Sequence, residues 1–154
     1  MKIIDLEPGD PRLAADLLPV LRELRPHLTP ALFGEIYAEG HPQGLRFSAA
    51  YDADGRCTGA AGWRIVAGTC DIRKLYVDDL VTASASRSTG VGRALLSYLE
   101  DRARAADCRL LDLDSGTQRT AAHRFYFRER MGVVAFHFGK ELDAGHENAV
   151  GPVG

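Results

Sequence analysis

Arg87-Ser88-Thr89-Gly90-Val91-Gly92 follows an apolar, strand-like run and leads directly into a segment with helical periodicity. The two glycines allow backbone conformations that other residues avoid, and they place no Cβ beside the chain. The first N–H groups of a helix have no partner within it, and the helix dipole favours negative charge there. The stretch therefore predicts an anion-binding turn between a strand and a helix.

The patterns on either side of this turn predict regular elements. Apolar residues recur at helical spacing from Val91 to Leu99, and Arg102 extends the same face. Before the turn, three strand-like segments cover 45–51, 57–67 and 70–82, the first two separated by an Asp-Ala-Asp-Gly turn. We expect an antiparallel meander that ends at the turn and continues into a long helix.

The rest of the chain predicts an α+β order. Asp10-Pro11 and Thr29-Pro30 each place a helix N-cap before a proline, so we expect two helices there, the first kinked at Pro19. The remaining predicted elements are strands over 1–6, 110–113 and 133–142 and a helix over 117–130. An antiparallel half joined to a strand-helix-strand crossover favours a mixed sheet.

Size and composition limit the class of protein. A chain of 154 residues fits one domain, expected over 1–143, with a flexible tail rich in glycine and small residues over 144–154. The net charge of -2 gives no general attraction to nucleic acid or to an anionic membrane. Because the chain shows neither a signal-peptide core nor an apolar run of about 18 residues, we expect a cytoplasmic protein. The excess of arginine over lysine is typical of a GC-rich bacterial genome.

Spacing separates the turn from two other glycine turns. A P-loop ends in Gly-Lys-Ser/Thr, whereas Gly92 is followed by Arg93-Ala94. A dinucleotide fingerprint needs a third glycine where Leu95 stands. What remains is an R-x-x-G-x-G turn between a strand and a long helix.

The strand end Asp79-Leu80-Val81-Thr82, four further residues and then the stretch 87–96 resemble the GNAT-type N-acetyltransferases, which bind acyl-coenzyme A. The element order also matches, so the resemblance covers residues 1–142. It implies the GNAT-like acyl-CoA N-acyltransferase fold, an α+β protein in three layers with a mixed central sheet of about six to seven strands and about four helices. It also implies that the strand end contacts the pantetheine arm and that the turn holds the pyrophosphate. The cofactor-binding residues expected on this basis are Leu80, Val81, Thr82, Arg87, Ser88, Thr89, Gly90, Val91, Gly92 and Arg93.

A second match lies further along the chain. The segment Ala122 to Tyr126, followed by Met131-Gly132, is similar to the family's A-x-x-x-Y segment, whose tyrosine often protonates the departing thiolate. The family frequently has asparagine three residues before this alanine, where Arg119 stands here. The resemblance therefore implies that Tyr126 is a catalytic acid, and the alternative is a tyrosine that merely packs with Phe125 and Phe127.

Acyl transfer from a thioester to an amine needs a neutral amine, a stabilised oxyanion and a proton for the thiolate. A phenol such as that of Tyr126 is protonated at neutral pH and can donate. The N–H of Leu80 or Val81, freed by a bulge or by splaying of the strand, would bind the acetyl carbonyl. Adjacent strand residues face opposite sides, and we expect Asp79 rather than Asp78 to bind or deprotonate the amine. The alternative is that both aspartates belong to a solvated strand end and that water carries the proton of the amine away.

These observations favour an N-acetyltransferase that moves an acetyl group from acetyl-CoA to a primary amine of a small molecule or peptide, by direct attack within a ternary complex. A non-catalytic acyl-CoA-binding module, as a sensor or an assembly subunit, is the main alternative, and a nucleotide-binding protein is a weaker one. No metal is expected, because His123 and His137 lack a third ligand at recognisable spacing. The amine acceptor is left unidentified, although the region around His27 and Tyr37 borders the acceptor pocket in the resembling family. A homodimer also stays open.

Overall fold

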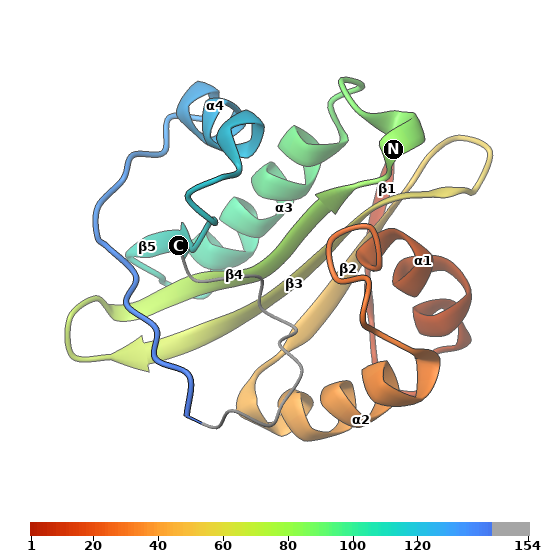
Figure 1. Cartoon of the computed structure of the whole chain (residues 1–154), viewed down its shortest axis with the longest axis horizontal. Helices are drawn as coiled ribbons and strands as arrows, with labels where there is room; N and C mark the ends of the chain where they lie inside the picture. The colour runs from red at the N-terminus through yellow and green to blue at the C-terminus, as the bar shows by residue number, and fades with distance from the viewer. Residues whose placement is uncertain (143–154) are drawn as a thin grey trace. The chain divides into compact units, whose positions relative to one another are not determined.

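The computed structural model describes residues 1–142, whose strands and helices are shown in Figure 1. Five strands form one sheet in the order β1-β2-β3-β4-β5. The first four pair antiparallel, and β5 pairs parallel with β4. The strands are β1 (Lys2–Leu6), β2 (Arg46–Tyr51), β3 (Cys57–Gly68), β4 (Ile72–Thr82) and β5 (Leu110–Leu113). The predicted α+β class is confirmed, with five strands in the described residues instead of six to seven.

Residues 1–142 also contain four α-helices. They are α1 (Leu18–Leu21), α2 (Pro30–Gly40), α3 (Val91–Ala105) and α4 (Thr120–Arg128), with short 3-10 turns at η2 (His41–Gln43) and η3 (Ser84–Ser86). The start predicted for α2 is confirmed, because the Thr29 hydroxyl accepts the N–H of Leu32 at 3.1 Å. The helix α4 is shorter at both ends than the predicted 117–130.

The first helical region is irregular at the proline. Pro11 and Arg12 are α-helical, and a π-helical turn follows, η1 (Leu13–Leu17), in which the N–H of Leu18 donates to the carbonyl of Leu13; α-helical geometry returns at Leu18. Pro19 lies in the first turn of α1 and has no N–H to donate. The irregularity expected at Pro19 thus takes the form of a change from π to α geometry.

The strand predicted over 133–142 is wrong. The described residues after α4 contain no strand, and the side chains of Val133, Phe136 and Phe138 are 76%, 84% and 90% exposed. Apolar residues favour a strand, but a strand forms only where a neighbour supplies backbone hydrogen bonds. The sheet of the described residues ends at β5. The tail predicted over 144–154 lies outside the described residues.

The chain divides into two compact units, Met1–Leu113 and the part that begins at Asp114. The first unit contains the whole sheet with α1, α2 and α3, and the described part of the second contains α4. A single domain over 1–143 therefore stays a prediction.

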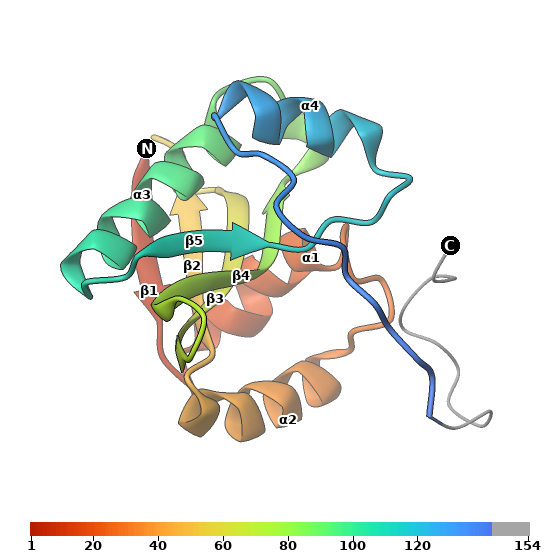
Figure 2. The same ribbon diagram turned by 90° about the vertical axis from the view of Figure 1, so that its left-hand side faces the viewer.

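In the first unit, helices cover both faces of the sheet. Figure 2 shows α3 on one side of the strands and α2 on the other. Neighbouring residues divide between the two apolar clusters: Ala49 and Ala60 belong to the cluster under α1 and α2, whereas Ala50 and Ala61 belong to the cluster under α3. This division follows from the two-residue period of a strand. The sheet is thus the central layer of three.

A chain of polar groups ties three strands to α3. The indole N–H of Trp63 donates to the buried hydroxyl of Ser48 at 2.9 Å, and Ser48 donates to Asp5 at 2.6 Å. The hydroxyl of Tyr98, on α3, donates to the same Asp5 oxygen at 2.8 Å. Trp63 is therefore a core residue whose polar atom has a partner, which is the condition for burying an indole.

A glycine sets how closely α3 approaches the sheet. A Cβ at Gly59 of β3 would lie 2.6 Å from Cγ1 of Val91 and 2.8 Å from Cδ1 of Leu95. Gly59 is the register partner of Thr82, the last residue of β4. The missing Cβ therefore brings the first turns of α3 against the end of β4.

Replacing Gly59 by Ala should lower the free energy of unfolding by about 1–3 kcal/mol, because the methyl group overpacks the contact with Val91 and Leu95. Urea unfolding of wild type and variant measures the difference. Gly68→Ala is the matched control, because nothing lies within 4 Å of a Cβ at the other end of β3. Equal stability of the two variants would contradict the close approach.

Candidate functional site

The predicted anion-binding turn lies between β4 and α3. Gly90 has φ +90° and stands immediately before α3, with nothing within 4 Å of the position that a Cβ would take. Ser88 also has positive φ, at 63°, and the Thr89 hydroxyl donates to the carbonyl of Ser86 at 2.6 Å. The turn is thus held in a left-handed conformation that favours glycine and leaves open space on the side where a Cβ would stand.

The N-terminus of α3 offers free donors. Within residues 1–142, the N–H groups of Val91 and Gly92 donate to no acceptor, whereas the N–H of Ala94 donates to the carbonyl of Gly90 at 3.0 Å. Arg87 and Arg93 are exposed on the two sides of these groups in sequence. Free N–H groups, the helix dipole and two cations together favour a phosphate-like anion.

The strand before the turn extends past its neighbour. The pairing of β4 with β5 ends at Val77 and Leu113, so Asp78 to Thr82 have no β5 residue opposite them. On the other edge, Leu80, Val81 and Thr82 still pair with β3. This part of β4 thus lacks β5 as a neighbour, and a free N–H at Leu80 or Val81 for the acetyl carbonyl stays a prediction.

The same part of β4 carries a bulge. Gly62 pairs with Asp79 and the next residue, Trp63, pairs with Val77, so Asp78 is the extra residue of β4. A bulge interrupts the regular ladder and redirects the side chains next to it. Asp78 and Asp79 accordingly bind different partners.

Asp79 is largely buried and is paired with an arginine that lies far away in sequence. Its side chain is 14% exposed, and its Oδ1 accepts Nε of Arg25 at 2.8 Å. Burial raises the pKa of the Asp79 carboxyl, and the charge and hydrogen bond of Arg25 oppose this rise. Asp78 instead binds the guanidinium of Arg64 through both oxygens, at 2.9 and 3.0 Å.

The loop between α1 and α2 also binds η3, just after the end of β4. A carboxylate oxygen of Glu23 accepts the N–H of Ser84 at 2.9 Å. Arg25 and Glu23 were not identified from the sequence, because their partners lie more than 50 residues away and no local pattern marks them. The loop thus contacts the end of β4 at two points.

Tyr126 lies on α4, in the second unit. Its ring is tilted against that of Phe125, with the centroids 5.4 Å apart, whereas Phe127 is 58% exposed. Burial raises the pKa of the Tyr126 phenol, with Arg119 opposing the rise, so the phenol is protonated at neutral pH. The structure thus describes a proton donor, and its catalytic role stays a prediction.

Two further residues that the sequence singled out, Tyr37 and His123, make hydrogen bonds to backbone carbonyls. Tyr37 is 2% exposed, and its hydroxyl donates to the carbonyl of Leu6 at 2.7 Å, so it belongs to the core rather than to an acceptor pocket. A ring nitrogen of His123 lies 2.9 Å from the carbonyl of Gly116. No group of three or more His, Cys, Asp or Glu side chains that could hold a metal ion occurs in residues 1–142. Nor does any helix in that range combine the length and apolarity needed to cross a bilayer.

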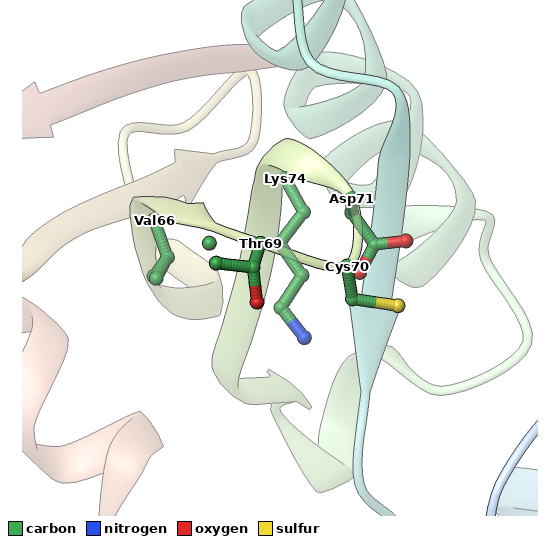
Figure 3. Close-up of a pocket in the computed structure, with 6 residues that line it drawn as sticks. Val66, Thr69, Cys70, Asp71 and Lys74 are labelled. Atoms are coloured by element: carbon green, nitrogen blue, oxygen red, sulfur yellow. The ribbon is translucent and has the colours of Figure 1, made fainter.

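A pocket is present at the other end of β4, at the β3–β4 hairpin (Figure 3). Lys74, which lines it, is bound to Asp112 of β5 at 2.8 Å. At about 3.3 Å per residue, the eleven residues of β4 from Ile72 to Thr82 place this pocket roughly 30 Å from the other end of the strand, where the turn follows. Its lining residues are Val66, Gly68, Thr69, Cys70, Asp71 and Lys74, none of which is a predicted site residue.

The sequence matches a family model described as the acetyltransferase (GNAT) family over residues 11–133. Two curated relatives match shorter segments. The chain is 48% identical over 58 residues to an uncharacterized N-acetyltransferase of Bacillus subtilis, and 36% identical over 66 residues to the aminoalkylphosphonate N-acetyltransferase of Salmonella typhimurium. These matches cover 38% and 43% of this chain and 40% and 43% of the relatives, so the chain matches less than half the length of either.

The fold also matches solved structures. An aminoglycoside acetyltransferase from an uncultured soil metagenomic sample superposes with a TM-score of 0.74 at 18% identity, over 92% of this chain and 98% of that one. At this identity the similarity concerns the fold alone.

The raised pKa of Asp79 predicts how the free energy of unfolding changes with pH. The folded protein binds the Asp79 proton more tightly than the unfolded chain, whose carboxyl has the ordinary pKa of 3.8. The stability contributed by this group is therefore lost as the pH rises through the raised pKa. In urea unfolding at a series of pH values, wild type should lose stability relative to Asp79→Asn as the pH rises from about 4.

Asp10→Asn is the matched control because its effect has the opposite sign. The hydrogen bond from the Arg12 side chain lowers the pKa of Asp10 to about 2. Wild type should therefore gain stability relative to Asp10→Asn as the pH rises from about 2 to about 4. The same sign for both variants would contradict the burial of Asp79.

Proposed function

The chain belongs to the acetyltransferase (GNAT) family, and from that we propose that it transfers an acetyl group from acetyl-CoA to the primary amine of a small molecule or peptide. The observation that carries the proposal is that the first turns of α3 pack on Gly59 of β3, which pairs with the end of β4 that β5 leaves unpaired, inside the range that the family model matches. The end of β4 supplies backbone groups for an acyl chain, and the start of α3 supplies hydrogen-bond donors for an anion. Together they suit a substrate that carries a thioester at one end and phosphate groups further along.

The residues of the turn are compatible with the pyrophosphate of coenzyme A. Val91 and Gly92 have free N–H groups, Gly90 leaves the approach open, and Arg87 and Arg93 add positive charge. Ser88 and Thr89 would contribute backbone N–H groups rather than side chains. Leu80, Val81 and Thr82 would face the pantetheine arm along the edge of β4 that β5 leaves unpaired.

The reaction that we propose is direct attack of the amine on the thioester. Asp79 takes a proton from the acceptor ammonium, the neutral nitrogen forms the new C–N bond, and the C–S bond breaks. The nitrogen loses its second proton to water, and Tyr126 protonates the thiolate before water reprotonates the phenolate. The balance is one ammonium and one thioester giving an amide, a thiol and one proton.

The acceptor belongs on the side of β4 that carries Asp79. A buried carboxylate with one free oxygen suits an ammonium group better than an anion. Arg25 and Arg64 are both bound to carboxylates, so neither offers an unpaired cation for an acidic acceptor. The named substrate class of the Salmonella relative, an aminoalkylphosphonate, agrees with a primary amine on a small molecule. The proposal includes that the enzyme is bacterial and acts in the cytoplasm.

Gly90→Val should weaken coenzyme A binding by about tenfold to a hundredfold. The side chain cannot hold φ +90° without strain, so the turn rearranges and loses one or two charge-assisted hydrogen bonds. Isothermal titration calorimetry with coenzyme A measures the effect. Gly9→Val is the matched control, since Gly9 has the same φ and the same open space in another turn. Unchanged affinity in a folded Gly90→Val protein would contradict the assignment of the turn as the pyrophosphate site.

Tyr126→Phe should lower kcat by about a hundredfold to ten-thousandfold, because the thiolate loses its proton donor. The assay is thiol release from acetyl-CoA with a panel of primary amines. Tyr76→Phe, in β4 near the hairpin, serves as the control for loss of a hydroxyl. If wild type binds coenzyme A tightly but turns over no amine, the protein is a binding module and not an enzyme.

A further inference from the structure

Arg25 holds two parts of the β4 bulge with one guanidinium. Its Nε donates to Oδ1 of Asp79 at 2.8 Å, and a terminal nitrogen donates to the backbone carbonyl of Asp78 at 3.3 Å. It reaches β4 from the loop between α1 and α2. The same loop binds Ser84 through Glu23. The end of β4 that β5 leaves unpaired is therefore held by this loop.

The pair leaves one carboxylate oxygen of Asp79 available. Oδ1 is taken by Arg25, whereas Oδ2 accepts no hydrogen bond from any residue that the structure describes. Oδ2 points toward Gly62 of β3, where a Cβ would lie only 2.9 Å away. The absence of a side chain at Gly62 thus lets Oδ2 and the Phe47 ring both lie close to β3.

Arg25 is the cation that acts most directly on Asp79. The charged groups that face Asp79 are Arg25 from the loop, Asp78 from β4 and Arg64 from β3. Arg64 and Asp78 are bound to each other through two hydrogen bonds, so their charges largely cancel at Asp79. Phe47, which contacts the same place from β2, brings no charge.

We infer that Arg25 is a positioning residue for the proposed acetyl transfer: it fixes Oδ1 of Asp79 and leaves Oδ2 as the oxygen that accepts the proton of the acceptor ammonium. This inference rests on the proposed function. Arg25 also favours the ionised carboxylate against the effect of burial, which raises the pKa of Asp79. A protein without this cation would hold Asp79 protonated, and unable to accept a proton, over a wider pH range.

The test is the pH dependence of kcat/KM for acetyl transfer in wild type, Arg25→Gln, Arg25→Lys and the control Arg12→Gln. The activity of wild type should fall on the acidic side as Asp79 becomes protonated. In Arg25→Gln, this acidic limb should move to higher pH by about one unit or more, because the opposite charge is lost. Arg25→Lys keeps the charge and should return the limb toward its wild-type position. Arg12→Gln, which removes an arginine from Asp10, a carboxylate that does not act on Asp79, should leave the limb in place.

A second readout does not depend on turnover. The carboxyl carbon of Asp79, followed by NMR, should titrate at higher pH in Arg25→Gln than in wild type. A purely structural role would lower the melting temperature and the rate without moving the limb or this titration, and that result would overturn the inference while the wild type stays active. A wild type that acetylates no amine would overturn the proposed function, and the inference with it.

Discussion

The candidate site depends on the missing side chain of Gly59. Val91 and Leu95 fill the position that a Cβ would take, so the first turns of α3 lie directly on β3 at the residue that pairs with the end of β4. The strand end and the helix N-terminus are thereby brought together, although eight residues separate Thr82 from Val91 in the sequence. A larger residue at this point would push the helix, and the free N–H groups at its start, away from the strand.

The end of β4 is held by polar contacts where the sheet no longer supports it. Pairing with β5 stops at Val77, and the bulge at Asp78 follows at once. Two ion pairs, one to Arg25 and one to Arg64, then fix the two adjacent carboxylates on different partners. The arrangement keeps a buried carboxylate ionisable and leaves the strand edge open, and both properties suit a transfer of an acyl group to an amine.

Local signals in the sequence predicted the parts of the site that are built locally. The glycine turn before Val91 and the helical period of α3 were correct, and the family resemblance drawn from them is confirmed. The pairing of Arg25 with Asp79 could not be predicted, because the two residues are 54 positions apart and their contact is set by packing of the whole first unit. The strand expected over 133–142 failed for a related reason: strand propensity is local, whereas strand formation needs a partner. The roles of Tyr126 and of the turn residues are still predictions.

Binding of acetyl-CoA by the end of β4 and the start of α3 is the proposal on which the others depend. Its most direct test is an NMR titration of the 15N-labelled protein with coenzyme A, following the backbone amide of every assigned residue. We expect the largest shift changes to fall on residues 80–82 and 88–92 and to saturate together. Saturating changes confined to other parts of the chain, such as the β3–β4 hairpin at residues 66–74, would contradict this proposal.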